Sequence, residues 1–190
     1  DLHTAYRRQR QMCIRDRASH SEDWKVTMID TGLNTMTGSR LKRVQKYVAN
    51  EPFCLTYGDG VADIDILDTI QKHNESGRYL SMTVYKPAGR FGSVHIDSTT
   101  NTVLSFEEKP DGEGNWINAG FFVCEPEVFN YLPENDDTCV FEKQPLERIV
   151  KDGQMHAYKH TGFWKPMDTL RDNQELNKLW TEEKAPWKVW

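Results

Sequence analysis

Alternating and helix-periodic runs of apolar residues follow one another along the first part of the chain. Residues 25–30 alternate between polar and apolar side chains and end at a Thr-Gly pair, which is typical of a strand. The segment 35–38 then introduces a predicted helix. Its apolar residues recur at helical spacing, namely Leu41, Val44 and Val48. Pro52 ends this helix, and the short apolar run 53–57 favours a second strand.

A second helix and a third strand come next. Asp63 is a suitable N-cap for the helix, and Gly77 stands just past its end. Leu67 and Ile70 fall on one face of it. Residues 80–85 alternate again as a strand does. Strands and helices that alternate at this spacing predict βαβ units and a mostly parallel, doubly wound sheet.

The second half of the chain has a different order of elements. Two short alternating strands, 93–96 and 102–108, are joined by polar turn residues and predict a hairpin beside the main sheet. The remaining predictions are a strand at 117–123, helices at 127–132 and 146–151, a strand at 155–160, a loop at 161–168 and a final helix at 169–180. No internal repeat or low-complexity linker divides these elements, which favours one domain.

Composition and charge narrow the class of protein. The chain has 190 residues and a net charge of −5, and no apolar run approaches the length of a membrane span. We therefore expect a soluble protein that binds neither membranes nor nucleic acid. The four cysteines, Cys13, Cys54, Cys124 and Cys139, form no Cys-x-x-Cys pair. This pattern predicts reduced thiols and a cytoplasmic location.

The end of the strand at 53–57 carries the first candidate for chemistry. The apolar run stops at Gly58-Asp59-Gly60, which delivers one carboxylate to the end of a sheet. Ligands of open α/β sheets bind at the carboxyl ends of strands, and glycines there allow backbone and ligand to approach closely. A lone aspartate suits a hard cation such as Mg²⁺. The alternative for these three residues alone is a tight turn.

Seven stretches together resemble the sugar-1-phosphate nucleotidylyltransferases and occur in the order typical of that family. They are Asp30–Gly32, Met36–Arg43, Tyr57–Gly60, Gly89–Gly92, Glu107–Pro110, Ile117–Gly120 and Gly162–Thr169. Each of them is weak evidence by itself, but seven in order are specific. The resemblance covers residues 23–190 and implies a three-layer α/β/α Rossmann-like fold with a mostly parallel central sheet and a small hairpin region.

The resemblance also implies a reaction. In its details the chain is similar to family members that transfer a cytidylyl group from CTP to α-D-glucose 1-phosphate, which yields CDP-glucose and pyrophosphate for surface polysaccharide (O-antigen) synthesis. Two alternatives stay open within the enzyme class, namely transfer from UTP or from dTTP. The family is oligomeric, and the apolar tail that contains Trp180 and Trp187 could form a subunit contact. We therefore expect a homo-oligomer.

Site residues follow from the resemblance by position. Asp59 and Asp168 would share one Mg²⁺ that touches both substrates' phosphates, and Lys109 would hold the phosphate of glucose 1-phosphate. The positions expected to bind substrate are Gly38, Arg40, Gly58, Gly92, Glu108, Lys109, Asn118 and Gly120.

Several of these residues also have a structural alternative. Asp168 could be a helix N-cap, Arg40 an exposed residue of an amphipathic helix, and Asn118 with Gly120 a strand start followed by a glycine bulge. The spacing of His156 and His160 resembles that of metal ligands. The two histidines fall in a strand-like run, however, so zinc is not favoured.

The N-terminal part departs from the family pattern. Members open with a Gly-rich phosphate loop of the type Gly-Gly-x-Gly-Thr-Arg, and this chain contains no such loop. We expect residues 1–22 to be an unmatched segment and residues 23–190 to be a catalytic domain whose first βαβ portion is missing. Two further readings remain: a non-catalytic sugar-phosphate-binding module, and a nucleic-acid binder that uses the five arginines of Asp1–Arg17.

Overall fold

The computed structural model describes residues 25–48, 50–87, 93–107 and 115–188, which fall into two units that divide between Asp30 and Thr31. In the first unit, residues 25–30 form neither strand nor helix, so the strand expected there is wrong. A strand needs a neighbour for its backbone hydrogen bonds, and no strand of the described ranges pairs with this segment. Val26 and Met28 accordingly remain 73% and 69% exposed.

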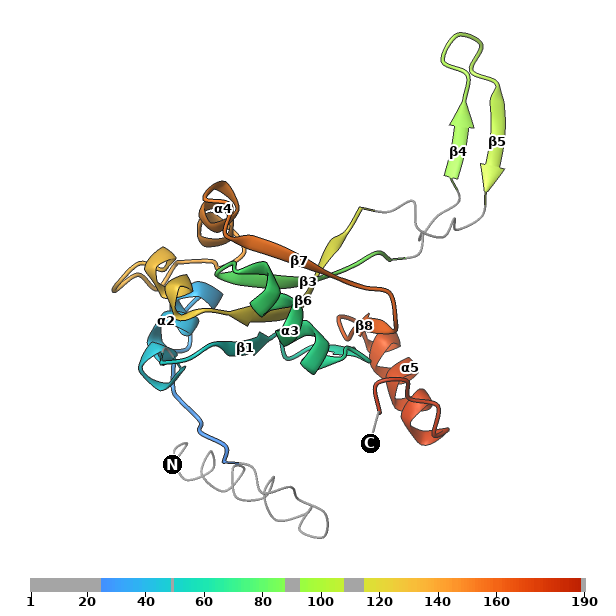
Figure 1. Ribbon diagram of the computed structural model, residues 1–190. Coiled ribbons are helices and arrows are strands. Elements are labelled where there is room, and N and C mark those ends of the chain that lie inside the picture. The colour runs from blue at the N-terminus through green and yellow to red at the C-terminus, as the bar shows by residue number, and fades with distance from the viewer. Residues whose placement is uncertain (1–24, 49, 88–92, 108–114, 189–190) are drawn as a thin grey trace. The chain divides into compact units, whose positions relative to one another are not determined.

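A four-stranded sheet organises the second unit (Figure 1). Its order is β1 (Phe53–Thr56), β6 (Ile117–Cys124), β3 (Leu80–Tyr85) and β7 (Met155–His160). β3 and β7 pair in parallel, whereas β6 runs antiparallel to both β1 and β3. Three of the four strands therefore point the same way, which confirms the mostly parallel sheet, with β6 as the one reversed strand in the described part.

Helices lie on both faces of this sheet. Neighbouring side chains of a strand point to opposite faces of the sheet, so the contacts of Ser81 and Met82 in β3 show what covers each face. Ser81 contacts His73 of α3 (Ile66–Ser76), with Oγ and Nδ1 2.8 Å apart. Met82 lines a cavity together with residues of α4 (Gln144–Lys151). The two helices therefore cover opposite faces, as the expected three-layer fold requires.

The cap of α3 differs from the prediction. Asp65, not Asp63, is the N-cap, and its Oδ1 accepts a hydrogen bond of 2.9 Å from the Asp68 N–H. The buried face of the helix also differs from the prediction: Leu67 is 80% exposed, whereas Thr69 and His73 are buried. The C-terminal prediction is confirmed, because Gly77 follows the helix with φ of +60°.

The hydrophobic core lies between the sheet and the elements on the α4 side. Helix α2 (Thr37–Val48) contributes Leu41, as the periodicity predicts. The helix expected at 127–132 is present as the 3₁₀ helix η1 (Pro126–Tyr131), which buries Phe129. Ring contacts connect these layers: Phe53 and Phe129 have centroids 5.5 Å apart. Within the described ranges, no helix is long and apolar enough to cross a membrane.

Two small strand pairs complete the second unit. β4 (Ser93–Ile96) and β5 (Val103–Glu107) form the expected antiparallel hairpin. β2 (Gly60–Ala62) and β8 (Trp164–Pro166) pair antiparallel, although 161–168 was expected to be a loop. A strand of three residues that ends in proline is too short to show a period of two, which explains why the pattern missed it.

The last helix, α5, spans Leu170–Thr181. Its N-cap is Thr169, whose side chain accepts from the Asp172 N–H in a capping box. The structural alternative for Asp168, that it caps this helix, is therefore wrong. The Asp168 carboxylate does not cap α5.

Candidate functional site

The pairing of β2 with β8 brings together the two segments that carry the aspartates singled out by the sequence. Gly60 lies opposite Pro166 in this pair, and the Met167 N–H donates to the Asp59 carbonyl over 2.7 Å. This bond places Met167 opposite Asp59, and Asp168 is the next residue along the chain. Both aspartates are exposed. Two segments far apart in the sequence consequently present carboxylates at the same end of one short ribbon.

The surroundings of these aspartates fit a magnesium ion. Mg²⁺ is commonly held by one or two carboxylates, and substrate phosphates and water complete its octahedral shell. The space beside Gly58 is open, since a Cβ there would have no neighbour within 4 Å. In the described ranges no three His, Cys, Asp or Glu side chains gather into a possible metal site. A two-carboxylate site completed by phosphates is the arrangement that Asp59 and Asp168 could form.

A hydrogen-bonded network adjoins the end of β1. The Tyr57 hydroxyl donates to Glu142, and Asn118 Nδ2 donates to the Tyr57 hydroxyl over 3.2 Å. Asn118 Oδ1 accepts from the Gly120 N–H over 2.8 Å. Burial, with a further contribution from Glu142, raises the pKa of Tyr57, so its hydroxyl stays protonated at neutral pH and can donate. The structure therefore joins Asn118 and Gly120 to the strand that leads to Asp59.

Glu142 is a member of this network that sequence reasoning missed. Its second oxygen, Oε2, accepts a hydrogen bond of 2.7 Å from the Thr37 hydroxyl at the start of α2. Thr37 Oγ1 in turn accepts from the Phe141 N–H over 2.9 Å. The local sequence around Glu142 carries no signal for this role, because its partners come from two distant elements.

Gly38 lies where α2 meets the segment 139–142. Its N–H donates to the Cys139 carbonyl over 2.9 Å. A Cβ at this position would lie 2.7 Å from Cys139 Sγ and 3.0 Å from the Cys139 oxygen. The glycine thus permits a close backbone approach. Gly38 was expected to bind substrate, but its N–H is bonded to a protein carbonyl here.

Gly38→Ala is therefore expected to destabilise the fold by about 1–3 kcal/mol, because the methyl group must displace backbone atoms. Urea unfolding followed by circular dichroism would measure the change. Gly60→Ala is the matched control, since its Cβ would find its nearest neighbour at an ordinary 3.7 Å. Equal stability of the two variants would contradict the prediction.

Arg40 makes local contacts within the second unit. Its Nη1 donates to Thr31 Oγ1 over 2.8 Å, and its Nη2 donates to the Leu33 carbonyl over 3.1 Å. These bonds attach the segment 31–33 to α2. A contact of Arg40 with substrate remains a prediction. Glu108, Lys109 and Gly92 lie outside the described residues.

The two histidines with metal-like spacing have other partners. His156 Nδ1 lies 3.2 Å from Ser81 Oγ, and His160 Nε2 lies 2.9 Å from the Phe163 carbonyl oxygen. Both rings are thus engaged with protein groups in the described part of the chain.

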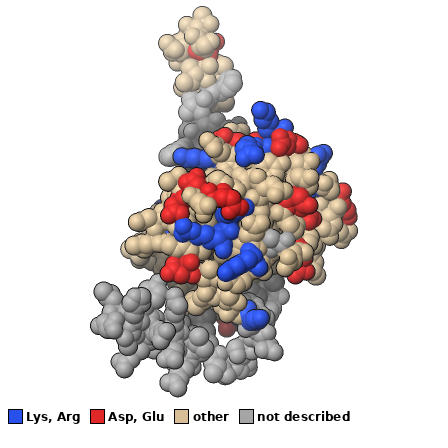
Figure 2. All heavy atoms as spheres, turned by 90° about the vertical axis from the view of Figure 1, so that its left-hand side faces the viewer, with Lys and Arg blue, Asp and Glu red and all other residues tan. Residues whose placement is uncertain are grey.

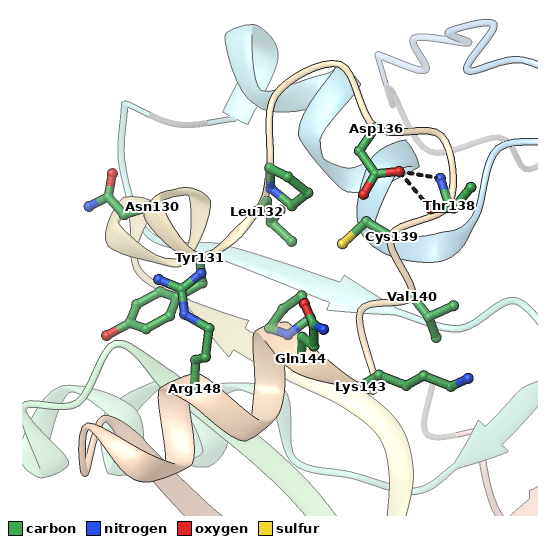
Figure 3. Close-up of a pocket in the computed structure, with 12 residues that line it drawn as sticks. Asn130, Tyr131, Leu132, Asp136, Thr138, Cys139, Val140, Lys143, Gln144 and Arg148 are labelled. Carbon is green, nitrogen blue, oxygen red and sulfur yellow. Dashed lines mark hydrogen bonds between the residues drawn. The ribbon is translucent and has the colours of Figure 1, made fainter.

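Two cavities of about 450 Å³ each open on the α4 side of the second unit. One lies beside Asn118 and Glu142, and Met82, Leu146, Val150 and Met155 form its apolar wall. The other, shown in Figure 3, lies between η1, the segment after it and the start of α4. In this second cavity Arg148 stacks over the Tyr131 ring, and Thr138 donates to Asp136. Only the first cavity includes a residue predicted for the site.

Charges of both signs alternate on the face shown in Figure 2. Lys42 Nζ lies 2.8 Å from Glu134 Oε1, and Arg43 pairs with Asp137. Carboxylates therefore neutralise basic side chains of α2. Among the residues that the structure describes, this face is not a continuous basic surface of the kind that nucleic-acid binding requires.

Comparison with known sequences finds relatives in the family that the sequence motifs resemble. The curated glucose-1-phosphate cytidylyltransferase of Salmonella typhi is 48% identical over 170 residues, which are 89% of this chain and 65% of that protein. A probable glucose-1-phosphate cytidylyltransferase of Bacillus subtilis is 38% identical over 169 residues, with the same two coverages. The chain therefore spans just under two thirds of the length of these relatives.

Solved structures share the fold at lower identity. HddC from Yersinia pseudotuberculosis has a TM-score of 0.66 and 20% identity, covering 91% of this chain and 73% of HddC. A putative glucose-1-phosphate thymidylyltransferase from Bacillus anthracis has a TM-score of 0.58 and 18% identity, with coverages of 80% and 62%. The family model described as nucleotidyl transferase matches residues 8–183. This chain belongs to the nucleotidyl transferase family.

Proposed function

We propose that the chain carries the catalytic site of a glucose-1-phosphate cytidylyltransferase, which joins CTP and α-D-glucose 1-phosphate into CDP-glucose and pyrophosphate. The observation that carries this proposal is the pairing of β2 with β8, which sets Asp59 next to the segment of Asp168. The 48% identity to a relative of that name supports the choice of substrates. By the same analogy the protein would be a homo-oligomer and its product would feed polysaccharide synthesis.

The proposed reaction needs no nucleophile from the protein. A phosphate oxygen of glucose 1-phosphate attacks the α-phosphorus of CTP, and the bond from that phosphorus to the pyrophosphate oxygen breaks. The obstacle is the repulsion between two polyanions that must meet in line. Asp59 and Asp168 would hold Mg²⁺, which when bound neutralises phosphate charge.

The other residues would orient the sugar phosphate. Asn118 and the backbone at Gly120 would bind the hexose beside the cavity that Asn118 lines, where polar groups meet an apolar wall. Glu108 would accept hydrogen bonds from the sugar hydroxyls, and Lys109 would hold the sugar's phosphate. Tyr57 and Glu142 would keep the Asn118 amide in place through the bonds described above.

The assay is pyrophosphate release with Mg²⁺, glucose 1-phosphate and one nucleotide at a time, CTP, UTP or dTTP at equal concentration. It would use this chain and a chimera that adds the phosphate-loop portion of the Salmonella typhi relative. We expect the highest kcat/KM with CTP. A preference for UTP or dTTP would change the assigned base. Glucose 1-phosphate binding by calorimetry with no turnover in either protein would indicate a non-catalytic binding module.

A further inference from the structure

The ribbon formed by β2 and β8 is too short to set its own register. Each strand has three residues, and a slip of one residue would turn every side chain of β8 to the other face. Such a slip would also move Asp168 relative to Asp59. Some contact outside the three paired positions must therefore fix β8 in place.

Asp63 provides that contact at the end of the ribbon opposite Asp59. Its N–H donates to the Phe163 carbonyl over 3.2 Å, and its Oδ1 accepts from the Phe163 N–H over 2.7 Å. One residue thus holds both backbone groups of the position just before β8. Its side chain is 30% exposed, so the bonds are partly shielded from water.

His160 and Gly162 complete the same contact. His160 is buried, and its Nε2 lies 2.9 Å from the Phe163 oxygen and 3.1 Å from Asp63 Oδ1. Both neighbours are acceptors, so Nε2 carries the proton. A Cβ at Gly162 would lie 2.3 Å from Asp63 Oδ1 and 2.8 Å from His160 Cε1. The glycine is what allows the carboxylate and the ring to reach Phe163.

Trp164, the first residue of β8, attaches this strand to the main sheet. Trp164 Nε1 donates to the Ala119 carbonyl over 2.8 Å, and its ring lies 5.2 Å from that of Tyr85. β8 is therefore held against the sheet by Trp164 and held in register along β2 by Asp63. Asp168 follows only two residues after the end of this strand.

We propose that Asp63 is a positioning residue for the candidate metal site: with His160 it fixes the register of β8 on β2 and so places Asp168 beside Asp59. The inference rests on the proposed function only in treating Asp59 and Asp168 as the metal ligands. The register itself does not depend on any substrate. The hydrogen bond from the Phe163 N–H needs an acceptor oxygen at Oδ1 and not a negative charge. Asparagine at position 63 should therefore keep the register of β8.

Two measurements on this chain test the proposal without catalysis. In Asp63→Ala, amide exchange of Met167, whose N–H bonds to the Asp59 carbonyl, is expected to accelerate about tenfold or more as the ribbon opens. The Kd for Mn²⁺, used as the spectroscopic probe in place of Mg²⁺, is expected to rise about tenfold, as for other residues that orient metal ligands. Asp63→Asn should stay near the parent chain in both.

Asp65→Ala is the matched control, since it removes the cap of α3 two residues away and lowers the melting temperature without touching β8. It should leave Met167 exchange and the Mn²⁺ Kd unchanged. Unchanged Met167 exchange in Asp63→Ala, or equal effects of Asp63→Ala and Asp65→Ala, would overturn the proposal. The Mn²⁺ titrations are made with glucose 1-phosphate present, because substrate phosphate completes the proposed site. If the parent chain binds no Mn²⁺ under these conditions, the metal assignment fails, and the exchange result alone decides the role of Asp63.

Discussion

Asp59→Asn is expected to lower kcat/KM for pyrophosphate release by about a thousandfold, on the order of 4 kcal/mol in the activation free energy. Asparagine has nearly the same size, but it loses the charge that attracts a divalent cation. Asp168→Asn should have an effect of similar size, because its carboxylate would serve the same ion. Steady-state assays of the active chimera over a range of Mg²⁺ concentrations would measure both.

The control for these variants is Asp65→Asn. It makes the same change six residues from Asp59, at a helix N-cap where asparagine is as good as aspartate. We expect its kcat/KM to equal that of the unsubstituted protein. Unchanged rates in either Asp59→Asn or Asp168→Asn would remove that residue from the assigned metal pair.

Gly120→Ala is expected to lower the free energy of unfolding by about 3 kcal/mol, from two costs. The residue has φ of +81°, a left-handed conformation that alanine adopts at a penalty. Its new Cβ would lie 2.6 Å from Cδ2 and 3.1 Å from Cγ of Tyr57. The ring would have to move, and with it the hydroxyl that accepts from Asn118.

Chemical denaturation of Gly120→Ala would measure this loss. Gly58→Ala is the control for stability, because a Cβ there enters open space and should change the unfolding free energy by less than about 0.5 kcal/mol. Loss of glucose 1-phosphate binding in still-folded Gly120→Ala would further support the hexose position beside Asn118. A stability equal to that of Gly58→Ala would contradict the clash with Tyr57.

Short strands and caps were the features that local pattern could not resolve. The sequence analysis predicted Asp63 as the N-cap of α3, but in the structure Asp65 caps this helix and Asp63 bonds to Phe163. The strand at 164–166 is visible only through its pairing with 60–62. The strand expected at 25–30 fails for the same reason, since alternation does not supply a pairing partner.

The amino-acid sequence by itself predicted the four strands of the main sheet, α2 and the hairpin, and the family resemblance singled out Asp59 and Asp168 for the proposed site. Periodicity and ordered motifs are local properties that the chain carries wherever it folds. Only the tertiary structure showed that the segments of these two aspartates lie side by side through β2 and β8, that Glu142 joins Tyr57 to Thr37, and that Asp63 bonds to both backbone groups of Phe163. Such contacts join segments far apart in the chain. A local pattern of side chains does not predict which distant segments will be neighbours in the folded chain.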